Sequence, residues 1–106
     1  MGGWLNAVVF IIIWRYSVAP NRDGDFLSAY GPNGEWRRLF SSASGYLGTE
    51  LVEREEPGGY MTIDRWHDEA AFDGFMAENK EYEELDLRLA ALTTLEELIG
   101  RGSAVG

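Results

Sequence analysis

The sequence predicts an α+β fold whose elements follow the order strand, helix, strand, strand, helix, strand. Three observations predict it: a β-branched and aromatic run at residues 8–18, a hairpin pattern across residues 46–66, and helical spacing of apolar residues in the stretches between and after them. With 106 residues, 45% of them hydrophobic, the chain can bury one core and is too short for two domains. We therefore expect a single domain over residues 1–106, with its core at about 8–100.

The first strand is predicted at residues 8–18 and ends at the turn formed by residues 19–21. Successive side chains of a strand point to opposite faces. One face then carries Val9, Ile11 and Ile13, and the other carries Phe10, Ile12, Trp14 and Tyr16. Because both faces are apolar, we expect both to be buried.

The first helical stretch is predicted to start at residues 23–25, where acidic side chains favour a helix N-terminus. The turn at residues 31–34 divides this stretch into two helical pieces. Helical spacing of apolar residues carries the second piece through Ala43, and residues 44–45 are predicted to end it.

The second half of the chain begins with strands at residues 46–55 and 60–66, joined by a Pro-Gly-Gly turn as a hairpin. Asp68 is predicted to cap a helical stretch that continues in register to Leu92. Residues 94–97 have the spacing of a capping box, so we expect a short helical turn there. We expect residues 101–105 to form a last edge strand.

This element order is the split β-α-β pattern of ferredoxin-like folds. The two helical stretches of such a fold cover only one face of the sheet, so the second apolar face of residues 8–18 is left uncovered. A partner sheet would bury that face, and the sequence therefore predicts a homodimer.

The charge and the residue inventory exclude several classes of function. The net charge of −9 repels phosphate backbones and anionic lipids, so we expect neither a nucleic acid nor a membrane as partner. The apolar run at residues 7–14 is far shorter than the ~20 residues of a membrane span. No Lys or Arg precedes it, as one would in a secretory signal, so we expect a cytoplasmic protein. With no Cys, one His and no phosphate-binding glycine motif, we expect no metal and no other cofactor.

Aromatic side chains lie on elements that should face one another across the domain interior. Each of them fits plain core packing, and together they also fit a pocket for a flat apolar ligand between sheet and helices. The residues that would bind such a ligand are Trp14, Tyr16, Trp66 and Tyr82. Tyr hydroxyl and Trp N–H groups would supply polar contacts within the pocket.

Asp64 and His67 are the candidate catalytic residues. His67 follows the third predicted strand, where it is either an exposed or capping imidazole or a general base at a pocket mouth. Asp64 is a carboxylate in a mostly apolar strand, where it either pairs with Arg15 or Arg65 or acts as a pocket acid or base. A carboxylate that points into a cavity favours catalysis, and one paired with arginine favours architecture.

Three segments, residues 30–36, 45–51 and 60–66, the last followed by Ala71-Phe72, resemble small proteins of the antibiotic biosynthesis monooxygenase type. The resemblance covers roughly residues 10–100, and its most specific part is the strand that ends in Trp66. It implies a dimeric α+β barrel, in which two ferredoxin-like subunits pack sheet against sheet with their helices outside.

The resemblance also implies a function. Relatives of this type include cofactor-independent oxygenases of polycyclic phenols or quinols, and enzymes that degrade haem. The haem-degrading branch places an Asn on the first strand, a Trp at the end of the third and an axial His on the second helical segment. Here Trp66 resembles that Trp, whereas Trp14 and Asp86 stand at the other two positions, so no haem is expected.

Our leading hypothesis is a cofactor-independent monooxygenase that acts on a flat phenolic or quinol-type molecule. Trp14 and Trp66 would stack on the ring, Tyr82 would bond an oxygen atom, and Asp64 or His67 would accept the proton. The resulting anion can react with dioxygen directly. The alternatives are a protein that binds a small aromatic molecule without turnover and a purely structural dimer.

Overall fold

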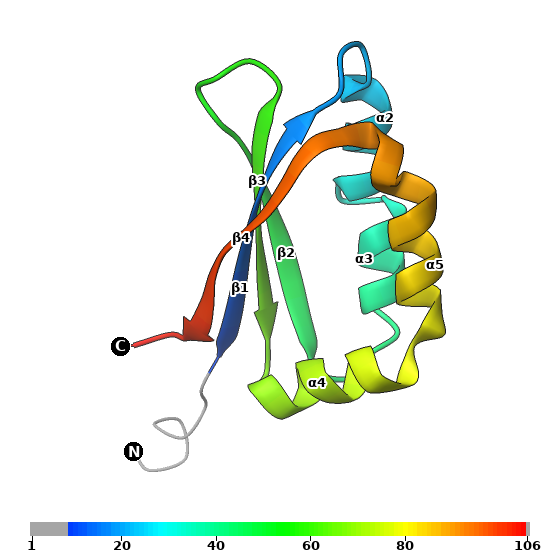
Figure 1. Cartoon of the computed structure of the whole chain (residues 1–106). Helices are drawn as coiled ribbons and strands as arrows, with labels where there is room; N and C mark the ends of the chain where they lie inside the picture. The colour runs from blue at the N-terminus through cyan, green and yellow to red at the C-terminus, as the bar shows by residue number, and fades with distance from the viewer. Residues whose placement is uncertain (1–8, 106) are drawn as a thin grey trace.

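The computed structural model describes residues 9–105 as one antiparallel sheet with the strand order β2-β3-β1-β4. Figure 1 shows the helices gathered on one side of this sheet, while the opposite side carries no helix. The strands are β1 (Phe10–Val18), β2 (Tyr46–Glu53), β3 (Gly59–Trp66) and β4 (Thr93–Ser103). The helices are α2 (Asp23–Tyr30), α3 (Glu35–Phe40), α4 (Glu69–Glu78), α5 (Lys80–Leu89) and the 3₁₀ turn η1 (Ala90–Leu92). The expected ferredoxin-like α+β fold is confirmed.

Strand β1 has the predicted alternation. Phe10, Ile12 and Tyr16 are buried under the helices, whereas Ile11 and Ile13 on the opposite face are only partly buried. The first predicted strand residue, Val8, lies outside the described part of the chain. Because β1 lies between β3 and β4, its inward residues form the centre of the core.

The helix starts also follow the sequence. Asp68 caps α4, since its carboxylate accepts a hydrogen bond from the Ala71 backbone N–H over 2.8 Å. The turn between α2 and α3 is tight, because a Cβ on Gly34 would lie 2.2 Å from the Ala29 carbonyl oxygen. This approach explains the need for glycine at that turn and brings the start of α3 close to α2.

Four predicted boundaries are wrong. The helix predicted to reach Ala43 ends at Phe40, and Asn79, with extended backbone, divides the stretch from Asp68 into α4 and α5. The helical turn predicted at residues 94–97 is part of strand β4, which pairs with β1 along most of its length. The last strand, predicted at residues 101–105, is the same β4, which begins at Thr93 and ends at Ser103. A full ladder of backbone hydrogen bonds outweighs the local preference of a capping box.

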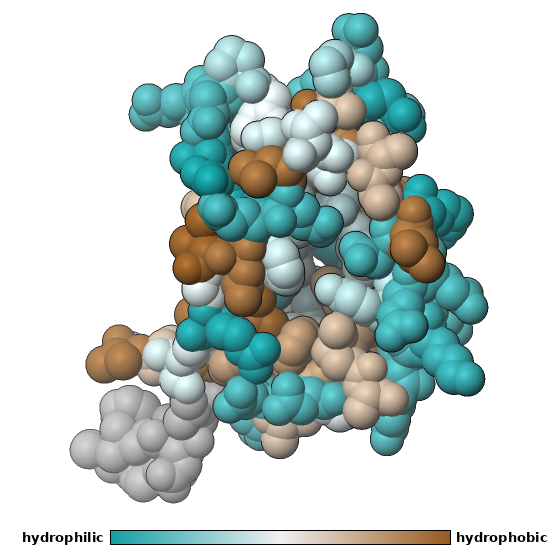
Figure 2. All heavy atoms as spheres, in the orientation of Figure 1, coloured by the Kyte–Doolittle hydropathy of each residue, from teal (hydrophilic) through white to brown (hydrophobic). Residues whose placement is uncertain are grey.

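The face of the sheet away from the helices is apolar and uncovered. Figure 2 shows hydrophobic atoms gathered on the sheet side of the molecule. Partly or fully exposed apolar side chains on this face include Ile11, Ile13, Val52, Met61, Ile63, Leu95 and Ile99. Two ion pairs, Arg15–Glu97 at 2.5 Å and Arg65–Glu50 at 3.4 Å, lie beside them. In the described residues 9–105, no helix is long and apolar enough to cross a membrane.

Candidate active site

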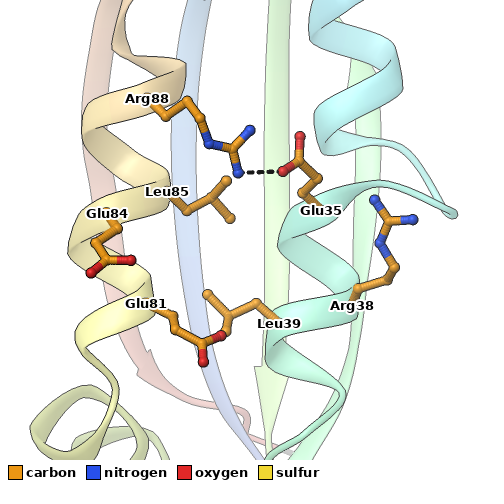
Figure 3. Close-up of a pocket in the computed structure, with 7 residues that line it drawn as sticks. All are labelled: Glu35, Arg38, Leu39, Glu81, Glu84, Leu85 and Arg88. Atoms are coloured by element: carbon orange, nitrogen blue, oxygen red, sulfur yellow. Dashed lines mark hydrogen bonds and ion pairs between the residues drawn. The ribbon is translucent and has the colours of Figure 1, made fainter.

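An open groove between α3 and α5 has a volume of about 560 Å³. Figure 3 shows Glu35 and Arg88 joined across one end of it. Its lining residues are Glu35, Arg38, Leu39, Glu81, Glu84, Leu85 and Arg88. The charged groups of this groove are solvated, and none of them is buried. Size alone therefore does not make it the reactive site.

A smaller cavity of about 220 Å³ lies between the sheet and the helices. It is more enclosed than the groove, and aromatic and aliphatic side chains form most of its wall. The lining residues are Ile12, Trp14, Phe40, Asp64, Phe72, Met76, Tyr82, Leu98 and Arg101. An apolar cavity with a few polar groups is the usual form of a small-molecule site.

Asp64 is the buried acid of this cavity, with an exposed fraction of 8%. Its Oδ1 accepts a hydrogen bond from the Thr49 hydroxyl over 2.6 Å. Burial raises the pKa of Asp64 to about 6, while the hydrogen bond from Thr49 and the charge of Arg37 act in the opposite direction. A carboxyl group with such a pKa can accept a proton near neutral pH.

The two arginines that the sequence analysis considered as ion-pair partners of Asp64 pair with other carboxylates. Arg15 pairs with Glu97 on β4, and Arg65 pairs with Glu50 on β2. Strand alternation places these pairs on the uncovered face of the sheet, opposite to Asp64. The structure therefore favours the cavity alternative for Asp64 over the architectural ion pair.

Trp14 and Tyr82 share the cavity with Asp64. Trp14 is partly buried on β1, so its indole can form a flat wall. Burial raises the pKa of Tyr82 to about 12, so its hydroxyl stays protonated at neutral pH and can donate a hydrogen bond to a ligand. The structure thus brings together one buried carboxyl group, one hydroxyl group and one large aromatic side chain in the wall of the cavity.

Arg101 is a cavity residue that sequence reasoning missed. Its guanidinium carbon lies 4.9 Å from the centre of the Phe10 ring and 5.4 Å from that of Phe72, and it pairs with Glu69 over 2.9 Å. The residue faces inward because Arg101 pairs with Ile12 in the β4–β1 register. No local pattern in the sequence indicated that register.

Three predicted site residues do not line the cavity: Tyr16, His67 and Trp66. The hydroxyl of Tyr16 lies 3.2 Å from that of Thr62, and the Tyr16 ring packs against Phe26. His67 is exposed, with its Nδ1 3.1 Å from the Asp68 carboxylate, because it follows the last residue of β3 and precedes the cap of α4.

Trp66 has no exposed surface and lies in the core, although we expected it to line the pocket. Its indole contacts the rings of Phe40, Tyr46, Phe72 and Phe75. The face that Trp66 occupies on β3 is the predicted one, but aromatic side chains from α3, α4 and β2 together cover the indole. Over residues 9–105, moreover, no group of three His, Asp or Glu side chains is placed to hold a metal ion.

The comparisons with known proteins agree on the fold. The family profile described as antibiotic biosynthesis monooxygenase matches residues 9–82. SnoaB, a cofactor-independent oxygenase from Streptomyces nogalater, has 22% sequence identity and a TM-score of 0.72, with 94% of each chain covered. Among curated proteins, none matches this chain.

Two further solved structures show the same architecture at lower identity. A protein of unknown function from Nitrosomonas europaea has 13% identity and a TM-score of 0.73, covering 94% of this chain and 92% of that one. PA3566 from Pseudomonas aeruginosa has 16% identity and a TM-score of 0.68, covering 93% of this chain and 96% of that one. At these identities the likeness concerns the fold alone.

Proposed function

Because this chain belongs to the antibiotic biosynthesis monooxygenase family, we propose that it is a cofactor-independent monooxygenase of small phenolic or quinol-type molecules. The observation that carries the proposal is the Asp64 carboxyl group, buried in an aromatic cavity with no arginine pair. SnoaB, which has the same fold, is itself described as a cofactor-independent oxygenase.

The proposed chemistry begins with proton transfer. Asp64 accepts the proton of a ring hydroxyl, and the electron-rich anion that results reacts with dioxygen. For a quinol, one oxygen atom enters the ring and the ring is oxidised to a hydroxyquinone. The second oxygen atom leaves as water, which takes up the displaced ring hydrogen and one proton from solvent in place of the proton that Asp64 accepted. The Tyr82 hydroxyl donates a hydrogen bond to the substrate oxygen, and Trp14 packs against the ring face.

The size of the cavity sets the size of the substrate. A dry cavity of about 150 Å³ holds benzene in other proteins, so the 220 Å³ here suits one ring or two fused rings. The ionised Asp64 would repel a carboxylate on the substrate, and the guanidinium of Arg101 on the same wall is already paired with Glu69. The substrate class that fits best is therefore a neutral, one- or two-ring quinol.

We propose that the working form is a homodimer in which the uncovered faces of two sheets meet. Ile13 and Ile63 are register partners at the centre of that face, and each fully buried side chain of this kind contributes roughly 1.5–3 kcal/mol to association. The cavity lies on the other side of the sheet, so a partner would leave its wall intact.

Oxygen uptake tests the proposed activity. The purified protein is assayed with a panel of one-, two- and three-ring quinols, with the uncatalysed rate subtracted. We expect uptake with the smaller members, a loss of about 100-fold or more in Asp64→Asn, and unchanged uptake in His67→Ala.

Two other results would contradict this function. A ligand of the panel that binds, as seen by Trp fluorescence, without any oxygen uptake would favour the non-catalytic binding protein. Activity that survives in Asp64→Asn but is lost in His67→Ala would show that His67, and not Asp64, is the base.

A further inference from the structure

Three oxygen-bearing side chains form a continuous hydrogen-bonded row that leads away from the cavity. The Thr49 hydroxyl donates to Oδ1 of Asp64 over 2.6 Å, and the Tyr46 hydroxyl lies 2.5 Å from Thr49 Oγ1. Asp64 is on β3, while Thr49 and Tyr46 are on β2, the edge strand. The row therefore runs from the buried cavity to the margin of the sheet.

A β-bulge brings Tyr46 and Thr49 to the same face of β2. Residues three apart on a regular strand point to opposite faces. Here Tyr46 pairs with Trp66, whereas Thr49, three residues on, pairs with Asp64, only two residues back. Gly48 accommodates the extra residue with a φ of +139°, which suits glycine. Such bulges re-aim side chains beside functional sites.

While Asp64 is ionised, the bonding pattern fixes the direction of each donor. An ionised carboxylate can only accept hydrogen bonds, so the single hydroxyl proton of Thr49 is directed to Asp64. The Thr49 oxygen is then left to accept the hydroxyl proton of Tyr46. Burial raises the pKa of Tyr46, so its hydroxyl keeps its proton at neutral pH and the row is complete.

The surroundings of Asp64 leave it little direct contact with water. Only 8% of the residue is exposed, whereas Tyr46 is half-buried on the edge strand. The charged or titratable groups that face Asp64 or its cavity from the other elements are Arg37 on α3, Tyr82 on α5, Tyr16 on β1 and Arg101 on β4. None of these four is hydrogen-bonded to the Asp64 carboxylate in the described residues.

We propose that Thr49 and Tyr46 relay to solvent the proton that Asp64 accepts in the cavity, and so return Asp64 to its ionised form. This inference rests on the proposed function, which makes Asp64 the base. A protonated Asp64 is a donor, so the hydroxyl groups of Thr49 and Tyr46 must first rotate from the arrangement of the ionised state, until Asp64 donates to Thr49, Thr49 to Tyr46 and Tyr46 to water. The Asp64 O–H bond then breaks as its proton passes to Thr49 Oγ1. The proton of Thr49 passes to the Tyr46 oxygen, the proton of Tyr46 passes to water, and both hydroxyl groups stay neutral.

The experiment measures proton exchange at Asp64 in the unliganded protein, so it needs no substrate. Aspartate labelled with ¹³C at the side-chain carboxyl is followed by NMR from pH 4 to 8, and Asp64→Asn assigns the Asp64 resonance. In the wild type we expect one resonance that shifts smoothly through the titration. In Thr49→Val and Tyr46→Phe the exchange rate falls at least about tenfold, and the resonance broadens at its midpoint.

Matched variants separate the relay from a loss of structure. Thr49→Ser keeps the hydroxyl and restores fast exchange, and it also restores the Asp64 pKa that Thr49→Val raises. Thr62→Val removes a neighbouring buried hydroxyl, bonded to Tyr16 rather than to Asp64, and leaves the exchange unchanged. If Thr49→Val does not fold, Tyr46→Phe carries the test.

Equal line widths in the wild type, Tyr46→Phe and every folded Thr49 variant would overturn the relay, whatever the oxygen assay shows. Absence of oxygen uptake with every quinol would instead overturn the proposed function while the exchange data stand. With an active quinol, the relay predicts that Tyr46→Phe slows steady-state turnover but not the first turnover, and that a small diffusible buffer restores the steady-state rate.

Discussion

The guanidinium of Arg101 lies over the ring of Phe10, 4.9 Å from its centre, and so joins the last strand to the first at the edge of the cavity. The same group pairs with Glu69 on α4. One side chain thus links β4, β1 and α4 around the hollow that holds Asp64. Its contacts combine a cation–π interaction with a partly exposed ion pair.

Replacing Arg101 should weaken the contacts between β4, β1 and α4 and so lower the stability of the protein. Arg101→Met keeps the length of the side chain but removes its charge, and we expect it to lower the free energy of unfolding by about 1 kcal/mol. Arg88→Met is the matched control, because Arg88 also pairs with a glutamate but has no aromatic ring beneath it. Urea denaturation of both variants measures the difference, and an equal effect in the two would contradict the role of the rings.

The burial of Asp64 should make stability depend on pH. Its pKa is about 6 in the folded protein, against roughly 3.9 for an unfolded Asp. The folded state therefore binds the proton more tightly, and the free energy of unfolding falls as pH rises from about 4 to about 6. Each unit of pKa shift is about 1.4 kcal/mol, so the ionised group destabilises the fold by about 3 kcal/mol above that window.

Asp64→Asn removes this ionisation and keeps an oxygen that can accept from Thr49. We expect the variant to be more stable than the wild type at pH 7.5, by up to about 3 kcal/mol, and close to it at pH 4. Denaturation at several pH values measures this, with Glu55→Gln as an exposed control. A variant less stable than the wild type at pH 7.5 would show that the Asp64 carboxylate is needed for the fold.

The parts of the structure that followed from sequence are those with a local physical cause. Alternation placed Asp64 on the inward face of β3, and the cap at Asp68 started α4 where expected. Thr49 and Arg101 were missed because each depends on register. The bulge at Gly48 turns Tyr46 and Thr49 to one face, and the pairing of β4 with β1 turns Arg101 inward.

The uncovered sheet face should hold two subunits together. Light scattering at micromolar concentration should give the mass of a dimer for the wild type and of a monomer for Ile13→Glu, because a buried unpaired charge beside Ile63 opposes association. Leu87→Glu is the control, since Leu87 is 78% exposed on α5, away from the sheet. A monomeric wild type would contradict the dimer and the barrel with it.

The two tryptophans that we first assigned to one site should respond differently to the same substitution. Trp66 is fully buried among four aromatic rings, and its indole N–H has no partner among the described residues. Trp66→Phe leaves a small void but also removes that unpaired donor, so we expect a loss of about 1–2 kcal/mol in stability. Trp14 lines the cavity and is only partly buried, so Trp14→Phe should cost less.

Trp14→Phe should affect ligand binding more than Trp66→Phe does, the reverse of their effects on stability. With 1,4-naphthoquinone as the probe, we expect Trp14→Phe to weaken binding and to remove most of the quenching of Trp fluorescence, because the indole that faces the cavity is gone. Trp66→Phe should keep the affinity, since Phe40 and Phe72 stand between its position and the ligand. If the affinity instead falls in Trp66→Phe and persists in Trp14→Phe, the ligand lies deeper than the cavity described, on the core side of Phe40.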